Sequence, residues 1–219
     1  MSTISDEAVQ KLSAKDTAPK RRRGRPREFD VDAALARALD VFWREGYAAA
    51  SLDEIGAATG LNRPSLYGAF GDKRELYLKA YHRYRERLRD EFGPLMTGVL
   101  PLREKLKRLF EAALGLYRAG GEDPRGCFTV LTASSDRIAD PDIRAAVAEA
   151  LASMDRTFER LFEKARTELP AGAEPARLAR QTTAWLHTLS VRARAGVPRA
   201  ALQEIVEDAV ISICGAEAG

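Results

Sequence analysis

Apolar residues recur at intervals of three and four positions along most of the chain, which is the period of an amphipathic helix. In residues 31–45 this spacing places Leu35, Leu39 and Phe42 on one face, between a capping Asp30 and a terminating Gly46. The same period predicts further helices over residues 72–92, 102–117, 140–162, 176–195 and 199–213. The sequence therefore predicts an all-α protein.

The segment Cys127–Ala133 is ambiguous, because its β-branched residues are also typical of a strand. Helical patterns lie on both sides and no strand is available to pair with it, so we predict a helix. The Gly93-Pro94 pair predicts a break after Phe92. We accordingly divide the chain into a disordered arm (1–28), a first helical domain with its linker helix (29–92) and a second helical domain (93–219).

Residues 51–73 carry the sharpest local pattern. Ser51 and Glu54 form a Ser-x-x-Glu capping box at the start of one short helix, and Gly60 follows that helix as a left-handed cap. Asn62 then caps a second helix, with Pro64 in its first turn. The pattern predicts a helix-turn-helix, whose second helix enters the DNA major groove. An ordinary pair of helices within a bundle is the alternative.

The composition of the second helix favours the DNA-binding interpretation. Leu66 and Phe70 are four residues apart and face inward, so the outer face consists of small residues together with Arg63 and Tyr67. A face of this kind permits close approach of a nucleic-acid backbone or groove wall.

The sequence Leu61-Asn-Arg-Pro-Ser-Leu-Tyr-Gly-Ala-Phe-Gly-Asp-Lys73, preceded by Gly46-Tyr-x-x-x-Ser-Leu-Asp-Glu-Ile55, resembles the DNA-binding domain of TetR-family transcriptional regulators. The resemblance is close over residues 28–80 and elsewhere extends only to the helical layout. It implies an N-terminal three-helix DNA-binding domain and a C-terminal helical bundle for ligand binding and dimerisation. It also implies that the aromatic residue Tyr47 packs near the DNA backbone, although a place at the core edge is an equal alternative.

Arg63 is our candidate for base readout, because arginine pairs with guanine through two hydrogen bonds. We expect Tyr67, Lys73 and Ser51 to hold phosphates and to set the register of the protein on a palindromic double-stranded operator. The predicted DNA-binding residues are Arg23, Arg25, Arg27, Tyr47, Ser51, Arg63, Pro64, Ser65, Tyr67 and Lys73.

The net charge of +3 is unevenly distributed, because residues 1–28 hold eight basic and four acidic side chains. Within them, Arg23-Gly-Arg-Pro26 resembles the core of an AT-hook, which places arginines in a narrow A·T-rich minor groove. A solvated tail that serves solubility is the alternative.

The resemblance places an effector site in the second domain, and its apolar residues suggest a small hydrophobic or reactive molecule. Cys127 follows Arg125 at an expected helix start, where a thiolate is stabilised, so it is a candidate sensor; the alternative is a small buried hydrophobe. The predicted ligand-binding residues are Phe110, Leu114, Tyr117, Cys127, Phe128, Met154, Phe158, Trp185 and Leu189.

The resemblance also implies that the last two helices meet their twins in a homodimer with two-fold symmetry. Their apolar stripes are equally consistent with an intrachain core. The dimer is favoured because one helix-turn-helix contacts only half an operator.

We find no enzyme signature, no cofactor motif and no metal-ligand spacing, and the two histidines, His82 and His187, are far apart in the sequence. His187 is interpreted as a hydrogen-bonding residue of the pocket or the dimer interface. The chain has no apolar run of membrane-spanning length, its polar start does not resemble a signal peptide, and its two cysteines make no disulfide framework. We therefore expect a cytoplasmic protein without a membrane partner.

These features predict a ligand-responsive DNA-binding repressor. An architectural DNA-binding protein that uses only the arm is one alternative, and a helical interaction or enzyme domain with an incidental helix-turn-helix is another. The repressor accounts for the large apolar second domain, which an architectural protein would not need.

Overall fold

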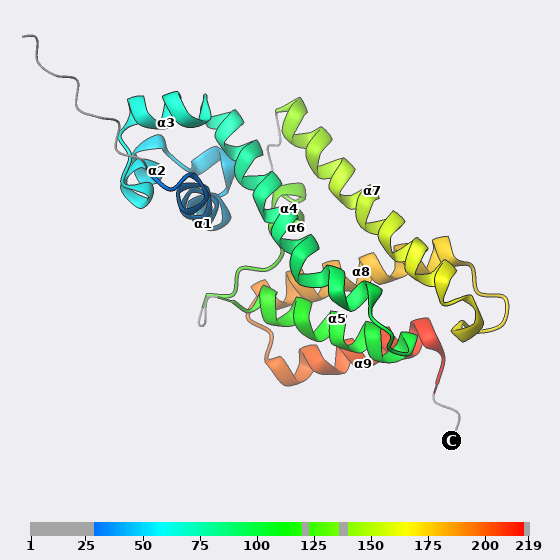
Figure 1. The fold of residues 1–219 in the computed structure, drawn as a ribbon. Coiled ribbons are helices and arrows are strands. Elements are labelled where there is room, and N and C mark those ends of the chain that lie inside the picture. The colour runs from blue at the N-terminus through cyan, green and yellow to red at the C-terminus, as the bar shows by residue number, and fades with distance from the viewer. Residues whose placement is uncertain (1–28, 120–122, 136–139, 217–219) are drawn as a thin grey trace, which may run out of the picture. The chain divides into compact units, whose positions relative to one another are not determined.

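The computed structural model describes residues 29–119, 123–135 and 140–216. Within these ranges the regular structure is entirely helical, which confirms the predicted fold class (Figure 1). The helices are α1 (Val31–Ala49), α2 (Leu52–Thr59), α3 (Arg63–Phe70), α4 (Lys73–Thr97), α5 (Leu102–Tyr117), α6 (Phe128–Ala133), α7 (Pro141–Lys164), the short 3-10 helix η3 (Arg166–Glu168), α8 (Pro175–Arg194) and α9 (Arg199–Cys214).

Helices α1 to α3 pack on one another and on the start of α4. Phe42, Ile55, Leu66 and Phe70 are buried in this part of the core. The backbone leaves the helical conformation at Gly46 (φ 77°, ψ 167°), as predicted, although a short helical continuation carries α1 on to Ala49.

Helix α4 does not end at Gly93-Pro94, so the predicted break is wrong. The helix runs through Pro94 to Thr97, and Gly98 closes it by donating its backbone N–H to the Pro94 carbonyl. A proline inside a helix costs a backbone hydrogen bond. Phe92 and Met96 pack against the core of the second domain on either side of Pro94, and this burial holds the helix across the proline. The predicted domain boundary therefore falls inside a continuous helix.

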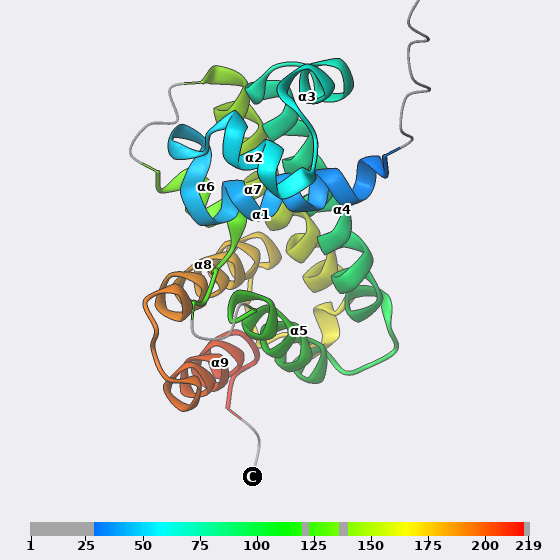
Figure 2. The same cartoon turned by 90° about the vertical axis from the view of Figure 1, so that its left-hand side faces the viewer.

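Helices α5, α8 and α9 lie side by side, and α7 packs along α8 (Figure 2). Seven apolar residues of α5 are buried: Leu102, Leu106, Leu109, Phe110, Ala113, Leu114 and Tyr117. The apolar stripes of the last two helices are also buried within the chain, so they belong to its own core. These residues include Leu178, Leu186, Leu189, Leu202, Val206, Val210 and Ile213.

The segment Phe128–Ala133 is a helix, as predicted, and begins at Cys127. Three tyrosines on successive turns of α4 reach it through buried polar contacts. The hydroxyl of Tyr77 lies 2.6 Å from Thr132 Oγ1, that of Tyr81 lies 3.1 Å from Thr129 Oγ1, and that of Tyr84 lies 3.5 Å from Cys127 Sγ. The residue numbers rise along one helix as they fall along the other, so α4 and α6 run antiparallel. Burial raises the pKa of all three tyrosines, that of Tyr81 to about 12. All three hydroxyls therefore stay protonated at neutral pH.

Trp43 extends the contact to α1. Its ring packs edge-on against Tyr84 at 5.1 Å and lies 5.5 Å from Phe128, between ring centroids. Its indole N–H donates to the Arg125 carbonyl at 3.1 Å. Trp43 therefore joins the first domain to the segment around α6, a contact that the helical period of α1 alone does not predict.

Candidate nucleic-acid interface

The start of α2 is fixed by the capping box that the sequence predicts. The backbone N–H of Ser51 donates to Glu54 Oε2 at 2.8 Å, and the Ser51 hydroxyl accepts from the backbone N–H of Glu54 at 3.1 Å. The Ser51 backbone N–H and the Ser51 hydroxyl, which also donates to Glu54 Oε2 at 2.8 Å, hold the pKa of the Glu54 carboxyl below its usual range. Ser51 is exposed at this rigid helix start, as a phosphate-binding residue must be.

The turn between α2 and α3 requires close approach of the backbone. A Cβ atom added to Gly56 would lie 2.8 Å from the Leu61 carbonyl oxygen. Gly60, which caps the end of α2, adopts the left-handed conformation (φ 72°). At the start of α3, Asn62 Oδ1 accepts from the backbone N–H of Ser65 at 2.9 Å. These contacts fix the angle between the two helices of the helix-turn-helix.

The outward face of α3 is free of the chain's own core, whereas Leu66 and Phe70 are buried, as predicted. Tyr67 has 51% of its surface exposed. The remaining candidates on this face are also exposed: Arg63, Pro64 and Ser65.

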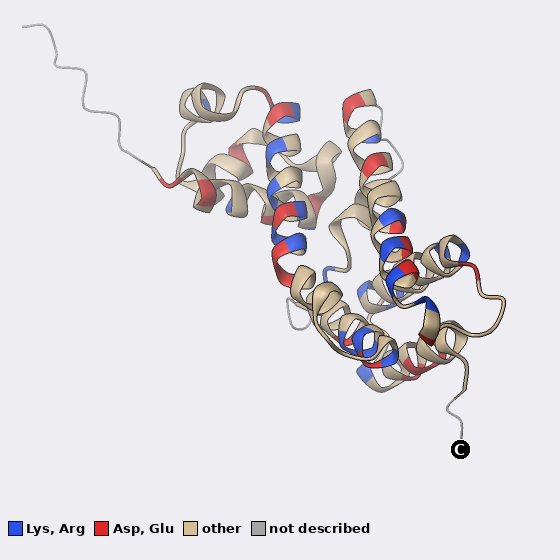
Figure 3. Cartoon of the chain, turned by 45° about the vertical axis from the view of Figure 1, so that its right-hand side comes forward, with Lys and Arg blue, Asp and Glu red and all other residues tan. Residues whose placement is uncertain are grey.

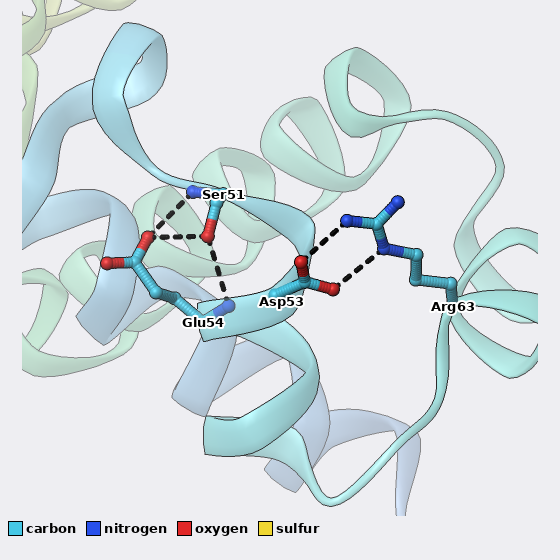
Figure 4. A network of polar contacts seen from close by, with 4 residues as sticks. All are labelled: Ser51, Asp53, Glu54 and Arg63. Carbon is cyan, nitrogen blue, oxygen red and sulfur yellow. Dashed lines mark hydrogen bonds and ion pairs between the residues drawn. The ribbon is translucent and has the colours of Figure 1, made fainter.

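Arg63 is held by a residue that the sequence analysis did not single out. Its Nε donates to Asp53 Oδ1 at 2.8 Å and its Nη2 donates to Asp53 Oδ2 at 2.6 Å (Figure 4). The guanidinium holds the pKa of the Asp53 carboxyl below its usual range. Nine residues, including the turn, separate the two, so no helical spacing points to this pair.

Tyr47 and Lys73, which are both half-buried, form a second feature beside α2. The Tyr47 ring packs edge-on against Tyr77 with its centroid 5.1 Å away, so it lies at the core edge, one of the two alternatives. Lys73 Nζ lies 5.0 Å from the centroid of the Tyr47 ring and donates to the Ala48 carbonyl at 3.3 Å. Desolvation lowers the pKa of Lys73, while the nearby Glu54 carboxylate opposes this shift. Lys73 is thus a cation in a defined position.

The outer face of α4 carries interleaved acidic and basic side chains (Figure 3). His82 Nε2 lies 3.2 Å from a Glu86 oxygen, Arg83 Nε lies 3.4 Å from an Asp32 oxygen, and Arg87 Nε lies 4.0 Å from a Glu91 oxygen. This mutual pairing agrees with a solvent face rather than with a second DNA surface. The remaining predicted DNA contacts, Arg23, Arg25 and Arg27, lie outside the described residues.

The predicted ligand-binding residues fall into two groups. Most belong to the buried core of the second domain or pack against it; they are Phe110, Leu114, Tyr117, Cys127, Met154, Phe158, Trp185 and Leu189. Phe128 instead lies between α1 and α4, with ring centroids 5.5 Å from Trp43 and 5.6 Å from Tyr77. The structure therefore separates Phe128 from the other candidates.

Cys127 is buried, with 3% of its surface exposed. Its backbone N–H donates to Ser190 Oγ at 2.7 Å. The expected cation is directed elsewhere, because Arg125 Nη1 donates to Asp40 Oδ1 at 2.6 Å and the guanidinium lies over the Trp43 ring. The expected activation of the thiol by Arg125 is therefore wrong, and the surroundings of Cys127 are those of a packing residue.

Two buried polar atoms in the second domain have no hydrogen-bond partner within the described part of the chain: Asp155 Oδ1 on α7 and His187 Nε2 on α8. Desolvation lowers the pKa of His187, and the Asp155 carboxylate opposes that shift. An unpaired buried polar atom costs about 1–3 kcal/mol, so this pair marks a place where a further polar group would be stabilising. His187 stood out in the sequence as one of two histidines, whereas nothing in the sequence distinguishes Asp155 from a surface carboxylate.

The described ranges contain no cluster of three or more His, Cys, Asp or Glu side chains suited to a metal ion. None of their helices combines the length and the apolar character that a bilayer span requires.

Residues 34–80 match the family model described as bacterial regulatory proteins, tetR family, and residues 103–209 match the tetracyclin repressor-like C-terminal domain. The HTH-type transcriptional repressor ComR of Escherichia coli (strain K12) is 30% identical over 189 residues, which cover 85% of this chain and 90% of ComR. This chain belongs to the TetR family. It is therefore a DNA-binding transcriptional regulator of helix-turn-helix type and not an enzyme.

Two further transcriptional regulators are similar to this chain. A cysteine variant of the regulator CifR, solved in complex with 26-base-pair operator DNA, is 33% identical and superposes with a TM-score of 0.79, covering 87% of this chain and 100% of CifR. The transcriptional activator FasR of Mycolicibacterium smegmatis (strain ATCC 700084 / mc(2)155) is 28% identical over 161 residues, 73% of this chain and 71% of FasR. Relatives of similar identity thus include both a repressor and an activator.

Proposed function

We propose that this chain is a repressor that binds a palindromic double-stranded operator as a homodimer and is released by a small hydrophobic or reactive effector. The observation that carries the proposal is the outward face of α3, where Arg63, Ser65 and Tyr67 are exposed on a helix whose position is fixed by capping. CifR, which has the same fold and 33% identity, was solved on operator DNA. Repression is chosen over activation because ComR, which is matched over 90% of its length against 71% for FasR, is a repressor.

Arg63→Ala and Lys73→Ala are expected to weaken DNA binding in different ways. Loss of Arg63 should cost about 1–3 kcal/mol on the operator and relax the base preference at one position in each half-site. Loss of Lys73 should weaken binding to all duplexes alike. It should also reduce the slope of the logarithm of the binding constant against the logarithm of the salt concentration by about one unit. Fluorescence anisotropy on a selected operator and on random duplex, over a salt titration, measures both.

The same titration separates the proposal from its alternatives. Equal losses on operator and random DNA for both variants would contradict the assigned roles. Wild-type protein that binds operator and random duplex equally would indicate an architectural protein acting through its basic arm. Absence of any duplex binding would leave the helix-turn-helix as an incidental feature.

The homodimer is proposed from the helix-turn-helix geometry and from the C-terminal pair of helices. One helix-turn-helix reads half of a palindrome, so two copies are needed for a full operator. On the outer faces of α8 and α9, Val191 and Ile211 are apolar and have 56% and 49% of their surfaces exposed. Contact with a second copy would remove both from water.

We place the effector in the second domain, whose core includes or contacts most of the apolar candidates and whose helices α7 and α8 carry Asp155 and His187. Its hydrophobic part would contact Phe110, Met154 and Phe158, and a polar group would satisfy the two unpaired atoms. In this arrangement Cys127 contributes packing and the effector binds reversibly.

Cys127 is expected to resist alkylation in the protein–operator complex. Because its thiol is buried beside Tyr84, N-ethylmaleimide should leave it unmodified while the complex stays intact. Mass spectrometry locates the modified cysteine and anisotropy reports binding, with Cys127→Ser and Cys214→Ser as controls. Release of the operator together with modification of Cys127, absent in Cys127→Ser, would instead make this thiol the sensor and the effector an electrophile.

A further inference from the structure

Arg63 and Asp53 join the two helices of the helix-turn-helix through a two-bond fork. Asp53 is the second residue of α2 and Arg63 is the first residue of α3. The Asp53 and Arg63 side chains are 73% and 58% exposed, so the pair lies on the surface that carries the proposed DNA contacts (Figure 4).

The fork leaves part of the guanidinium unused. A guanidinium has five N–H donors in one plane, and the contacts with Asp53 occupy the Nε donor and one Nη2 donor. The other Nη2 donor and both Nη1 donors remain. One N–H from each of these nitrogens points in parallel away from the end of the side chain, which is the arrangement that pairs with the O6 and N7 acceptors of guanine.

The location of Arg63 gives Asp53 an energetic role. A cation at the first position of a helix is disfavoured by the helix dipole, and a long arginine side chain loses rotamer freedom when it binds a base. Asp53 offsets the first effect and restricts the rotamers before DNA arrives. Asp53 is exposed and lies two residues from Ser51, a proposed phosphate-binding residue, so its negative charge opposes binding to DNA in general.

We propose that Asp53 is a specificity-determining residue that positions Arg63 for guanine. Asp53 lowers the affinity for all duplexes and increases the discrimination at one base pair in each half-site. This inference rests on the proposed function, because it requires that Arg63 reads a base. The alternative role is that of a latch, in which Asp53 holds Arg63 away from DNA. A latch predicts that Asp53→Asn binds the operator more tightly than wild type.

The test compares Asp53→Asn with wild type on duplexes that the wild-type protein selects from a random library. Asp53→Asn should lower the preference for guanine over adenine at the Arg63 position by about tenfold, because the unsupported side chain loses its fixed orientation. Binding to random duplex should rise by about twofold, since one negative charge near the phosphates is removed. Replacing that guanine by 7-deazaguanine removes the N7 acceptor and should reduce wild-type binding more than Asp53→Asn binding.

A matched control exists on α7 and η3. Arg166 makes the same fork with Glu163, through Nε at 3.1 Å and Nη2 at 3.0 Å. Both of these side chains are also exposed to solvent. Glu163→Gln removes an equivalent ion pair away from α2 and α3 and should change neither measurement. The charge swap of Asp53→Arg combined with Arg63→Asp restores an ion pair between α2 and α3, but it should not restore the guanine preference.

Each outcome has one meaning. Tighter operator binding by Asp53→Asn with the guanine preference retained would overturn positioning in favour of a latch. If Arg63→Ala abolishes the guanine preference but Asp53→Asn leaves it intact, only the role of Asp53 fails. If Arg63→Ala leaves the preference unchanged, the proposed readout by Arg63 fails first. Circular dichroism melting of each variant confirms that the compared proteins are folded.

Discussion

Phe128→Ala is expected to lower the free energy of unfolding by about 3–5 kcal/mol. The side chain is 1% exposed and lies among four rings from α1 and α4. Its centroid is 5.5 Å from that of Trp43, 5.6 Å from Tyr77, 5.9 Å from Tyr81 and 5.7 Å from Tyr84. Truncation removes the shared contact of rings that cannot collapse into the space, because each is fixed on a long helix. Urea denaturation of the purified protein measures the change.

Phe128→Leu serves as the matched control for this loss. A leucine keeps most of the apolar volume, so the expected cost is roughly 1 kcal/mol. The sequence instead predicts that Phe128 contacts the effector, in which case truncation should change the response to effector and not the stability. If Phe128→Ala changed effector response while leaving the urea midpoint unaltered, the residue would line a cavity rather than fill the core.

Gly56→Ala is expected to destabilise the protein by roughly 1–3 kcal/mol and to impair operator binding. Helix propensity alone favours alanine over glycine by about 1 kcal/mol, so an ordinary helical glycine would give the opposite sign. Here the new Cβ would lie 2.8 Å from the Leu61 carbonyl oxygen, a backbone atom that cannot move unless the turn moves. Because the turn sets the angle of α3, the variant should lose operator affinity by more than its fold destabilisation explains. Thermal melting and anisotropy measure the two effects separately.

Gly115→Ala provides the comparison, since Gly115 lies within α5 and a Cβ added there meets no atom within 4 Å. It should stabilise the protein by about 0.5–1 kcal/mol and leave operator affinity unchanged. A stabilising effect of Gly56→Ala equal to that of Gly115→Ala would show that the turn tolerates displacement.

The features that the sequence predicts well are those encoded by neighbouring residues. The capping residues Ser51 and Asn62 satisfy backbone groups within three positions, and each caps its helix as expected. The exposed face of α3 follows from the four-residue spacing of Leu66 and Phe70 in the same way.

The features that were missed depend on contacts between distant segments. Pro94 favours a helix end locally, but burial of the flanking residues of α4 outweighs that preference. Trp43 fits the period of its own helix, yet its partners are on α4 and around α6. Asp53 and Asp155 are ordinary acidic residues in the sequence, and only the fold places them beside Arg63 and His187. Spacing along the chain does not encode these pairs.

The antiparallel contact of α4 with α6 has a mechanical consequence. Three tyrosine hydroxyls engage three successive levels of α6 and its cap, and each pair is buried. Sliding one helix along the other would break all three contacts together and leave polar groups without water, so slippage is disfavoured at every intermediate step. We therefore expect α4 and α6 to move together. A displacement of Ser190 on α8, which accepts from the backbone N–H of Cys127, would then be transmitted through α6 to the Tyr77 end of α4.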